Sequence, residues 1–241
     1  MSFDSMKQTV SEFCHKNVLT FCVSCFLLFS LVTFGIQYRT ESIYRHRLIL
    51  NSMGLLKPHR IYLGWMIQSR YKQVHEFWMD GQTGELFRNR TRGRYPLFVV
   101  GKSSKTIKCY AFPFSFDGAY GPIEGMIGVA KDGATLTGFK ITRQNELGLG
   151  SKCEWAWFSH QFKGKRFANR EGKFVSMGVV QGKVEDKVPI SDVDENVQGI
   201  SGALLTNNRI EEGLRLTFKC YEPFSKKLRR EHYSHVDARG Y

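Results

Sequence analysis

The sequence predicts an α+β protein, in which a single N-terminal transmembrane helix precedes one domain with a hairpin-rich sheet and flanking helices. Three observations support this fold class. Residues Val18 to Ile36 form an uncharged apolar run, Gly121 to Arg143 alternate as two paired strands do, and from Asn207 apolar residues recur every three or four positions. The chain of 241 residues is long enough for one sizeable domain and such an anchor.

The apolar run is bounded by Lys16 and Arg39. At about 1.5 Å per residue it spans roughly 28 Å, close to the hydrocarbon thickness of a bilayer. A buried core helix would show a polar face, and a cleaved signal peptide would have a shorter run and an Ala-x-Ala cleavage site. We therefore expect residues 1–17 to be a short tail and 18–36 an uncleaved anchor. The Lys and Arg residues on its two sides do not decide the topology.

The net charge of +13 is spread along the whole chain, from Lys7 to Arg239. A basic balance is typical of proteins that bind nucleic acid, anionic lipid or an acidic partner. No zinc-finger spacing or RNA-binding signature accompanies the charge, so we predict no nucleic-acid partner.

Turn residues divide the part that follows the anchor. Segment 37–58 is predicted to be a juxtamembrane helix, because Gly54 and Pro58 end its apolar pattern. Asp80 to Phe87 is predicted to be a turn that enters a short strand, and Tyr95 to Phe114 two strands around a Gly-Lys-Ser-Ser-Lys turn.

The clearest local signals are one hairpin and one helix. Strands are expected at Met126–Ala130 and Leu136–Thr142, joined through Asp132-Gly133. In the helix from Asn207, Asn208 and Glu211 are expected to form the N-terminal cap. The helical face is formed by Ile210, Leu214, Phe218 and Tyr221. The domain is expected over 59–231, with a tail over 232–241.

Three cysteines follow the anchor, Cys109, Cys153 and Cys220. At most two of them can pair, and no pair is spaced like a metal site. Their redox state stays open. The sequence predicts no catalytic side chain and no metal ligand.

Four stretches, in this order, carry a resemblance to a known family. They are the anchor with Arg47–Leu56, then Gly121–Ile141, Asn145–Phe167 and Gly199–Leu216. Together they resemble the C subunit of the bacterial sodium-pumping NADH:quinone oxidoreductase, whose relative is the G subunit of the Rnf electron-transport complex. The tail Tyr221–Glu231 is more similar to the C subunit than to the G subunit.

The resemblance implies a single helix in the bacterial inner membrane and a periplasmic FMN-binding domain. The flavin would pass electrons within a complex that couples NADH oxidation to sodium export and quinone reduction. The implied partners are the other membrane subunits and the lipid bilayer. In the family, FMN is joined through its phosphate to the last Thr of a motif Asp-x-x-Ser/Thr-Gly-Ala-Thr.

This sequence departs from the attachment motif at two positions. The attachment position is Leu204, which has no hydroxyl and cannot form a phosphoester, and the Asp position is Gln198. Thr206 carries a hydroxyl two residues later, but it could replace the missing one only if the enzyme that attaches FMN accepted this shifted target. By resemblance, the phosphate end of a flavin would be bordered by Ser201, Gly202, Ala203 and Thr206.

A second cofactor-facing stretch has diverged in part. The family pattern Glu-Thr-Pro-Gly-Leu-Gly is Asn145 to Gly150 here, so its first three residues differ. The retained Gly148, Leu149 and Gly150 would line the ring end of a flavin. The stretch Trp157–Phe167 looks intact. The segment that resembles the structural part of the family thus keeps the family pattern, while the two segments that would face the cofactor depart from it.

Three interpretations stay open. The chain holds FMN without a covalent bond, through N–H groups of the Ser-Gly-Ala turn and the helix that follows it. Alternatively, it has lost flavin and acts as a structural or assembly subunit, or it is an unrelated membrane-anchored module. In the first case the isoalloxazine carries the electrons, and the chain is one subunit of a Na⁺-transporting NADH:quinone reductase.

Overall fold

The computed structural model describes residues 3–57, 59–101 and 106–237, with side chains for 26–33, 35–57, 59–101 and 106–232. Its first element is one continuous helix, α1 (Phe3–Ser52). The contacts within the chain define two units, Met1–Arg45 and His46–Tyr241.

The predicted anchor lies within α1, but the side chains of its residues 18–25 and 34 are outside the described ones. Among the described residues, no helix combines the length and the apolarity needed to cross a membrane. The anchor therefore stays a prediction. Beyond residue 36 the helix continues to Ser52, six residues short of the end predicted at residue 58.

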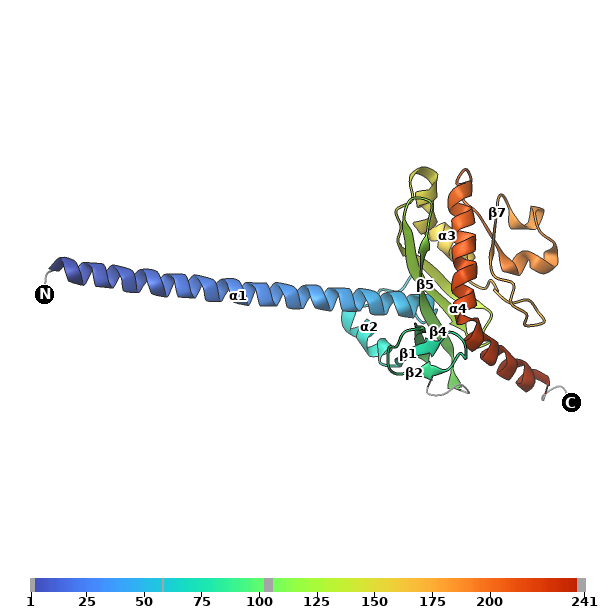
Figure 1. Ribbon diagram of the computed structural model, residues 1–241, viewed down its shortest axis with the longest axis horizontal. Coiled ribbons are helices and arrows are strands. Elements are labelled where there is room, and N and C mark those ends of the chain that lie inside the picture. The colour runs from blue at the N-terminus through green and yellow to red at the C-terminus, as the bar shows by residue number, and fades with distance from the viewer. Residues whose placement is uncertain (1–2, 58, 102–105, 238–241) are drawn as a thin grey trace. The chain divides into compact units, whose positions relative to one another are not determined.

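A six-stranded antiparallel sheet forms the centre of the second unit, with the order β2-β1-β3-β4-β5-β6 (Figure 1). The predicted hairpin and the predicted strand pair that precedes it are confirmed as β5–β6 and β3–β4. The long strand β1 was missed by the sequence analysis. The strands are β1 (Val74–Asp80), β2 (Leu86–Phe87), β3 (Arg94–Val100), β4 (Cys109–Asp117), β5 (Pro122–Ala130) and β6 (Leu136–Arg143).

Short elements and one long helix complete the unit. A two-stranded parallel pair, β7–β8, lies between the sheet and the last helix in the chain order. The remaining elements are α2 (Gly64–Tyr71), the 3₁₀ helices η2 (Gly148–Glu154), η3 (Val184–Asp186) and η4 (Ile190–Glu195), α3 (Ala156–Gln161), β7 (Gly178–Val180), β8 (Asn196–Gln198) and α4 (Leu204–Asp237).

The predicted cap of the last helix is wrong. Because α4 begins at Leu204, Asn208 lies inside its first turns. The side chain of Glu211 instead accepts a hydrogen bond from the amide of Val179 in β7, at 3.1 Å. Local sequence cannot show that a polar residue of the helix is used by a distant strand.

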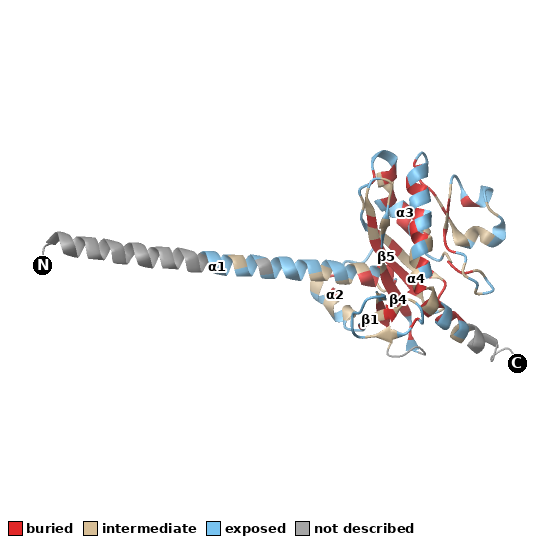
Figure 2. Ribbon diagram, in the orientation of Figure 1, coloured by how far each residue is buried: buried red, intermediate tan, exposed pale blue. Residues whose placement is uncertain are grey.

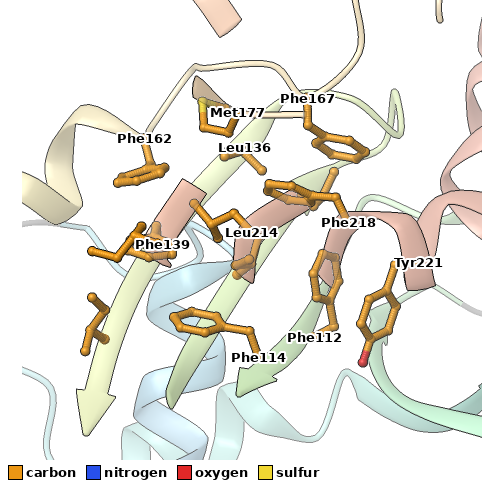
Figure 3. Packing of buried hydrophobic residues seen from close by; sticks show 14 of the residues in the cluster. Phe112, Phe114, Leu136, Phe139, Phe162, Phe167, Met177, Leu214, Phe218 and Tyr221 are labelled. Carbon is orange, nitrogen blue, oxygen red and sulfur yellow. The ribbon is translucent and has the colours of Figure 1, made fainter. Parts of the chain in front are cut away.

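Helix α4 packs on the sheet through aromatic side chains (Figure 3). The ring of Phe112 stacks on Tyr221 with centroids 3.9 Å apart and meets Phe218 edge-on at 6.3 Å. Phe218 in turn stacks on Phe167 at 4.6 Å. Burying one such side chain contributes about 1.5–3 kcal/mol, so this row fixes the position of α4. The buried residues line the contact between α4 and the strands (Figure 2).

The end of α1 is held against the sheet at a glycine. Side chains alternate along a strand, so Gly128 faces away from its core neighbours Ile127 and Val129. A Cβ at Gly128 would lie 1.9 Å from the carbonyl oxygen of Ser52, so only glycine permits this approach. The Thr137 hydroxyl donates to the same oxygen at 2.7 Å. The last turn of α1 is thereby part of the second unit.

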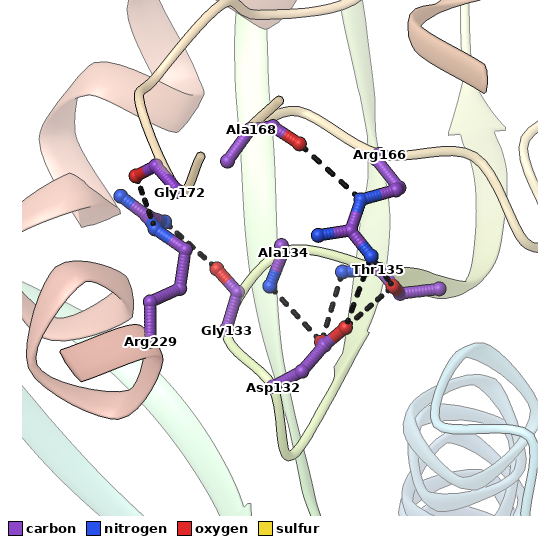
Figure 4. Close-up of polar contacts among 8 residues, drawn as sticks. All are labelled: Asp132, Gly133, Ala134, Thr135, Arg166, Ala168, Gly172 and Arg229. Atoms are coloured by element: carbon purple, nitrogen blue, oxygen red, sulfur yellow. Dashed lines mark hydrogen bonds and ion pairs between the residues drawn. The ribbon is translucent and has the colours of Figure 1, made fainter. Parts of the chain in front are cut away.

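The turn of the β5–β6 hairpin is organised by Asp132 (Figure 4). One carboxylate oxygen accepts bonds from the amides of Ala134 and Thr135, and the other from the Thr135 hydroxyl at 2.6 Å. Burial alone would raise the pKa of Asp132, but these bonds and the charge of Arg166 outweigh it and lower that pKa. This arrangement explains why the predicted Asp-Gly turn forms.

A buried arginine joins α4 to the same turn (Figure 4). Arg229 exposes 2% of its surface and forms an ion pair with Glu222. Its Nη1 donates to the carbonyl oxygen of Gly133 at 2.8 Å, and its Nε to that of Gly172 at 3.0 Å. One side chain thus holds three segments together.

Replacing this arginine tests the arrangement. We expect Arg229→Ala to lower the free energy of unfolding by about 3–5 kcal/mol, because it leaves the half-buried carboxylate of Glu222 and two carbonyls without their donor. Arg230→Ala is the matched control, since Arg230 is exposed, and should change it by less than about 0.5 kcal/mol. Denaturant unfolding followed by fluorescence measures both. Similar losses in the two variants would contradict the role of Arg229.

Candidate functional site

The turn before α4 is shaped by backbone contacts. The amide of Gly199 donates to the carbonyl of Val180 at 2.7 Å, which ends the β7–β8 pair. Asn207 then holds Ile200 from both sides, since its side chain accepts from the Ile200 amide and donates to the Ile200 carbonyl, each at 2.9 Å. Gly202 has φ +78°, a conformation that favours glycine. The chain therefore enters α4 through a fixed, tight turn.

The stretch Gly148–Gly150 lies directly against this turn. Gly148, with φ +56°, opens the 3₁₀ helix η2. A Cβ at Gly150 would lie 2.5 Å from the Thr206 hydroxyl, and a Cβ at Gly202 would lie 2.7 Å from a methyl group of Leu149. The structure therefore brings together the two stretches that the sequence analysis selected, although they lie far apart along the chain.

One residue that joins the two stretches was missed. Glu146 exposes 4% of its surface and accepts from the Thr206 hydroxyl at 2.5 Å. Its other oxygen accepts from the amides of Ala119 at 2.7 Å and Tyr120 at 3.2 Å. A buried carboxylate is tolerated when its oxygens are hydrogen-bonded, and it is favoured beside the first turn of a helix. The sequence held a weak signal, since this acidic residue of a basic chain stands two positions before Gly148.

The attachment position and its possible substitute, Thr206, differ in exposure. Thr206 exposes 4% of its surface, and its hydroxyl is bonded to Glu146. Leu204, at the attachment position, exposes 56%. The exposed position therefore lacks a hydroxyl, while the residue that has one is buried and engaged. Of the remaining turn residues, Ala203 is buried, and Ser201 and Gly202 are exposed.

The exposed side of the turn offers amides and an apolar rim. The amides of Leu204, Leu205 and Thr206 belong to the first turn of α4, where N–H groups have no acceptor within the helix. Around them, four leucines expose between 46% and 64% of their surfaces. These are Leu147, Leu149, Leu204 and Leu205. The residues fit a phosphate held by backbone amides beside an apolar group, and Leu204 at the attachment position offers no hydroxyl for a phosphoester.

The three cysteines whose side chains the structure describes are free, and one of them, Cys153, lies in η2. Cys109 and Cys153 are buried, and Cys220 is half-buried. Burial raises the pKa of Cys109 to about 11 and that of Cys153 to about 12. Both thiols are therefore protonated at neutral pH, and neither is an activated nucleophile.

The fold and the paired stretches are similar to those of a domain of the FMN-binding type. Residues 118–219 match the family described as FMN-binding domain, and every predicted flavin-site residue lies in this range. The predicted resemblance to the C subunit of the sodium-pumping oxidoreductase, and to its Rnf relative, is confirmed by similar proteins of both kinds.

Two curated relatives illustrate the similarity in sequence. The C subunit of the Na⁺-translocating NADH-quinone reductase of Chlamydia pneumoniae is 33% identical over 132 residues, which cover 51% of this chain and 41% of the relative. The G subunit of the Na⁺-translocating ferredoxin:NAD⁺ oxidoreductase complex of Acetobacterium woodii is 28% identical over 129 residues, 53% of this chain and 56% of the relative. The chain spans about half the length of the curated relatives it matches.

Two crystal structures share the fold. The C subunit of the Na⁺-translocating NADH-quinone reductase from Parabacteroides distasonis is 25% identical with a TM-score of 0.63, and the match covers 79% of this chain and 95% of that one. NqrC from Shewanella oneidensis has a TM-score of 0.64 and covers 81% and 99%, and at 19% identity it shows likeness of fold alone. The predicted α+β class is confirmed.

Removing the Thr206 hydroxyl tests the contact with Glu146. We expect Thr206→Val to lower the free energy of unfolding by about 1–3 kcal/mol, because a buried carboxylate loses a donor. Thr217→Val is the control: this hydroxyl bonds to the Gly213 carbonyl of its own helix, and its loss should cost clearly less. Chemical denaturation of both variants measures the difference. An equal loss of unfolding free energy in the two variants would argue against a special role of the hydrogen bond between Thr206 and Glu146.

Proposed function

We propose that this chain is an FMN-carrying electron-transfer subunit that holds its flavin without a covalent bond. The observation that carries the proposal is the contact of the Gly148–Gly150 stretch with the turn at Gly202, beside the start of α4. An FMN phosphate would be held by the first-turn amides of α4, on the side of the turn that Leu204 exposes. The ring would lie along Leu149 and its neighbours. Bound FMN supplies the electron transfer, and the chain supplies position and an apolar surround.

The proposed non-covalent state rests on the attachment position and on the substitute hydroxyl two residues later. Leu204 lacks a hydroxyl, and the Thr206 hydroxyl is buried against Glu146. A modifying enzyme would have to break this buried bond to reach Thr206. We therefore propose that neither position carries a phosphoester.

We further propose the setting that the relatives' names suggest. The chain would act in a membrane complex that transfers electrons from NADH to quinone and exports sodium, with residues 18–36 as its single span of the inner membrane, in contact with lipid and other membrane subunits. The domain 59–231 would face the periplasm. An Rnf-type complex is the alternative, and the relative from Acetobacterium woodii supports it.

A flavin-free role in structure or assembly is the second candidate. The pair of Glu146 and Thr206 favours it, since it closes the interior of the site with the chain's own groups. In that case the exposed leucines would contact a neighbouring subunit.

An absorbance spectrum of the purified full chain, followed by in-gel fluorescence after denaturation, separates these candidates. We expect an FMN spectrum in the native sample and a dark denatured band. A fluorescent band would contradict the non-covalent state. A colourless sample that also fails to bind added FMN would leave the flavin-free role.

A glycine variant locates the flavin. We expect Gly202→Ala to weaken FMN binding by about tenfold, because a left-handed φ costs an L-residue roughly 1–2 kcal/mol and the new Cβ would meet Leu149. Gly182→Ala is the control, since Gly182 has φ +90° but only Lys187 nearby, at 3.5 Å. Titration of apoprotein with FMN, followed by flavin fluorescence, gives both constants. Equal weakening would place the flavin elsewhere.

A further inference from the structure

A small cavity lies where the end of α1 meets β6 and α3, apart from the residues of the candidate flavin site. Its volume is about 230 Å³, several times the ~30 Å³ that one water molecule occupies. Its polar lining includes Asn51 at the end of α1, Lys140 in β6, and Ser159, His160 and Lys163 in and after α3. The last three belong to the stretch Trp157–Phe167, which the flavin site does not use.

The charge of the lining has one sign. Lys140 and Lys163 line the cavity, and no Asp or Glu is among its described lining residues. The Nζ of Lys140 lies 3.5 Å from the carbonyl oxygen of Glu154, a long contact that leaves its other N–H groups available. Such a lining favours an anion.

The acceptors nearest to the cavity are already used within the chain. The Ser52 carbonyl accepts from the Thr137 hydroxyl at 2.7 Å. The Asn51 carbonyl accepts from the amide of Gly54 at 3.0 Å, and the Leu50 carbonyl from that of Leu55 at 2.9 Å. These bonds satisfy the carbonyls that a helix end leaves open. The side chains of Lys140, Lys163 and Ser159 add donors to the same lining.

One of these donors is buried without a partner. Ser159 exposes 5% of its surface, and its Oγ forms no hydrogen bond with any described residue. A buried polar group that lacks a partner lowers stability, and such groups are rare in native proteins. In a cavity lined by cationic side chains, the partner that suits this hydroxyl is an acceptor with negative charge.

We propose that this cavity binds a phosphate-type anion. Phosphate oxygens accept hydrogen bonds, and they form short charge-assisted bonds with lysine and with hydroxyl groups. Lys140 and Lys163 supply the charge, and the Ser159 hydroxyl supplies a donor in a fixed position. A free phosphate or phosphomonoester and a phospholipid headgroup share this chemistry.

Binding of inorganic phosphate to the purified full chain tests the site. Calorimetric titration at fixed ionic strength, with chloride as the reference anion, should show one phosphate per chain. Lys140→Gln and Lys163→Gln should each weaken binding by about tenfold. The pair Lys183→Gln and Lys187→Gln removes equal charge at exposed positions and should change binding by less than about twofold. No phosphate binding, or equal weakening in the control pair, would overturn the proposal.

Ser159→Ala gives a readout that a purely structural role would not produce. In phosphate-free buffer the variant should be at least as stable to heat as the original chain, because a buried group without a partner is removed. The same variant should bind phosphate about three- to tenfold more weakly. A lower melting temperature without phosphate would show that the hydroxyl has a partner inside the chain, and the proposal would fail.

Competition with monomeric dihexanoylphosphatidylglycerol distinguishes the two sources. Displacement of phosphate by this lipid, lost in Lys140→Gln, would support a headgroup site. Phosphate binding that the lipid does not displace would support a free phosphate or phosphomonoester.

Discussion

The position of α4 depends on the stack of Phe112 on Tyr221, and much of the second unit depends on α4. The ring centroids are 3.9 Å apart, and Tyr221 also donates from its hydroxyl to the Pro96 carbonyl at 3.0 Å. This couples α4 to two neighbouring strands at once. With its middle fixed, the helix presents its start to the glycine stretch and its far turns, through Arg229, to the β5–β6 hairpin. Packing in the middle of one helix therefore determines the geometry at both of its ends.

The geometry of the candidate site depends on this packing of α4 on the sheet. Thr206 can reach Glu146 only if the first turn of α4 is in register with η2, and the same register places Leu149 on Gly202. Asn207, one residue further on, fixes the turn from inside through two bonds to Ile200. Two adjacent polar residues thus tie the helix start to two different segments, which explains why both are buried at a position where helices usually expose polar side chains.

The parts of the fold that the sequence predicted are those with local causes. The β5–β6 hairpin follows from an Asp-Gly turn, and the structure shows Asp132 accepting bonds from residues two and three positions on. The start of α4 was placed too late, because the polar residues near it serve distant partners. Glu146 escaped notice for the same reason: its donors come from residues 119, 120 and 206. The β7–β8 pair has three residues per strand, too few for a periodic signal.

The glycines of the site do not by themselves argue for a cofactor. Gly150 lacks a side chain where the Thr206 hydroxyl lies, and Gly202 lacks one where Leu149 lies, so the packing of the chain on itself requires both. The exposed leucines around the turn have no such internal reason. Leu204 and Leu205 each expose 56% of their surface, side by side at a helix start whose first amides have no acceptor within the helix. An apolar rim around first-turn N–H donors matches a ligand that is flat and apolar at one end and anionic at the other. A protein neighbour would have to supply both features from one surface, which makes a flavin the simpler occupant.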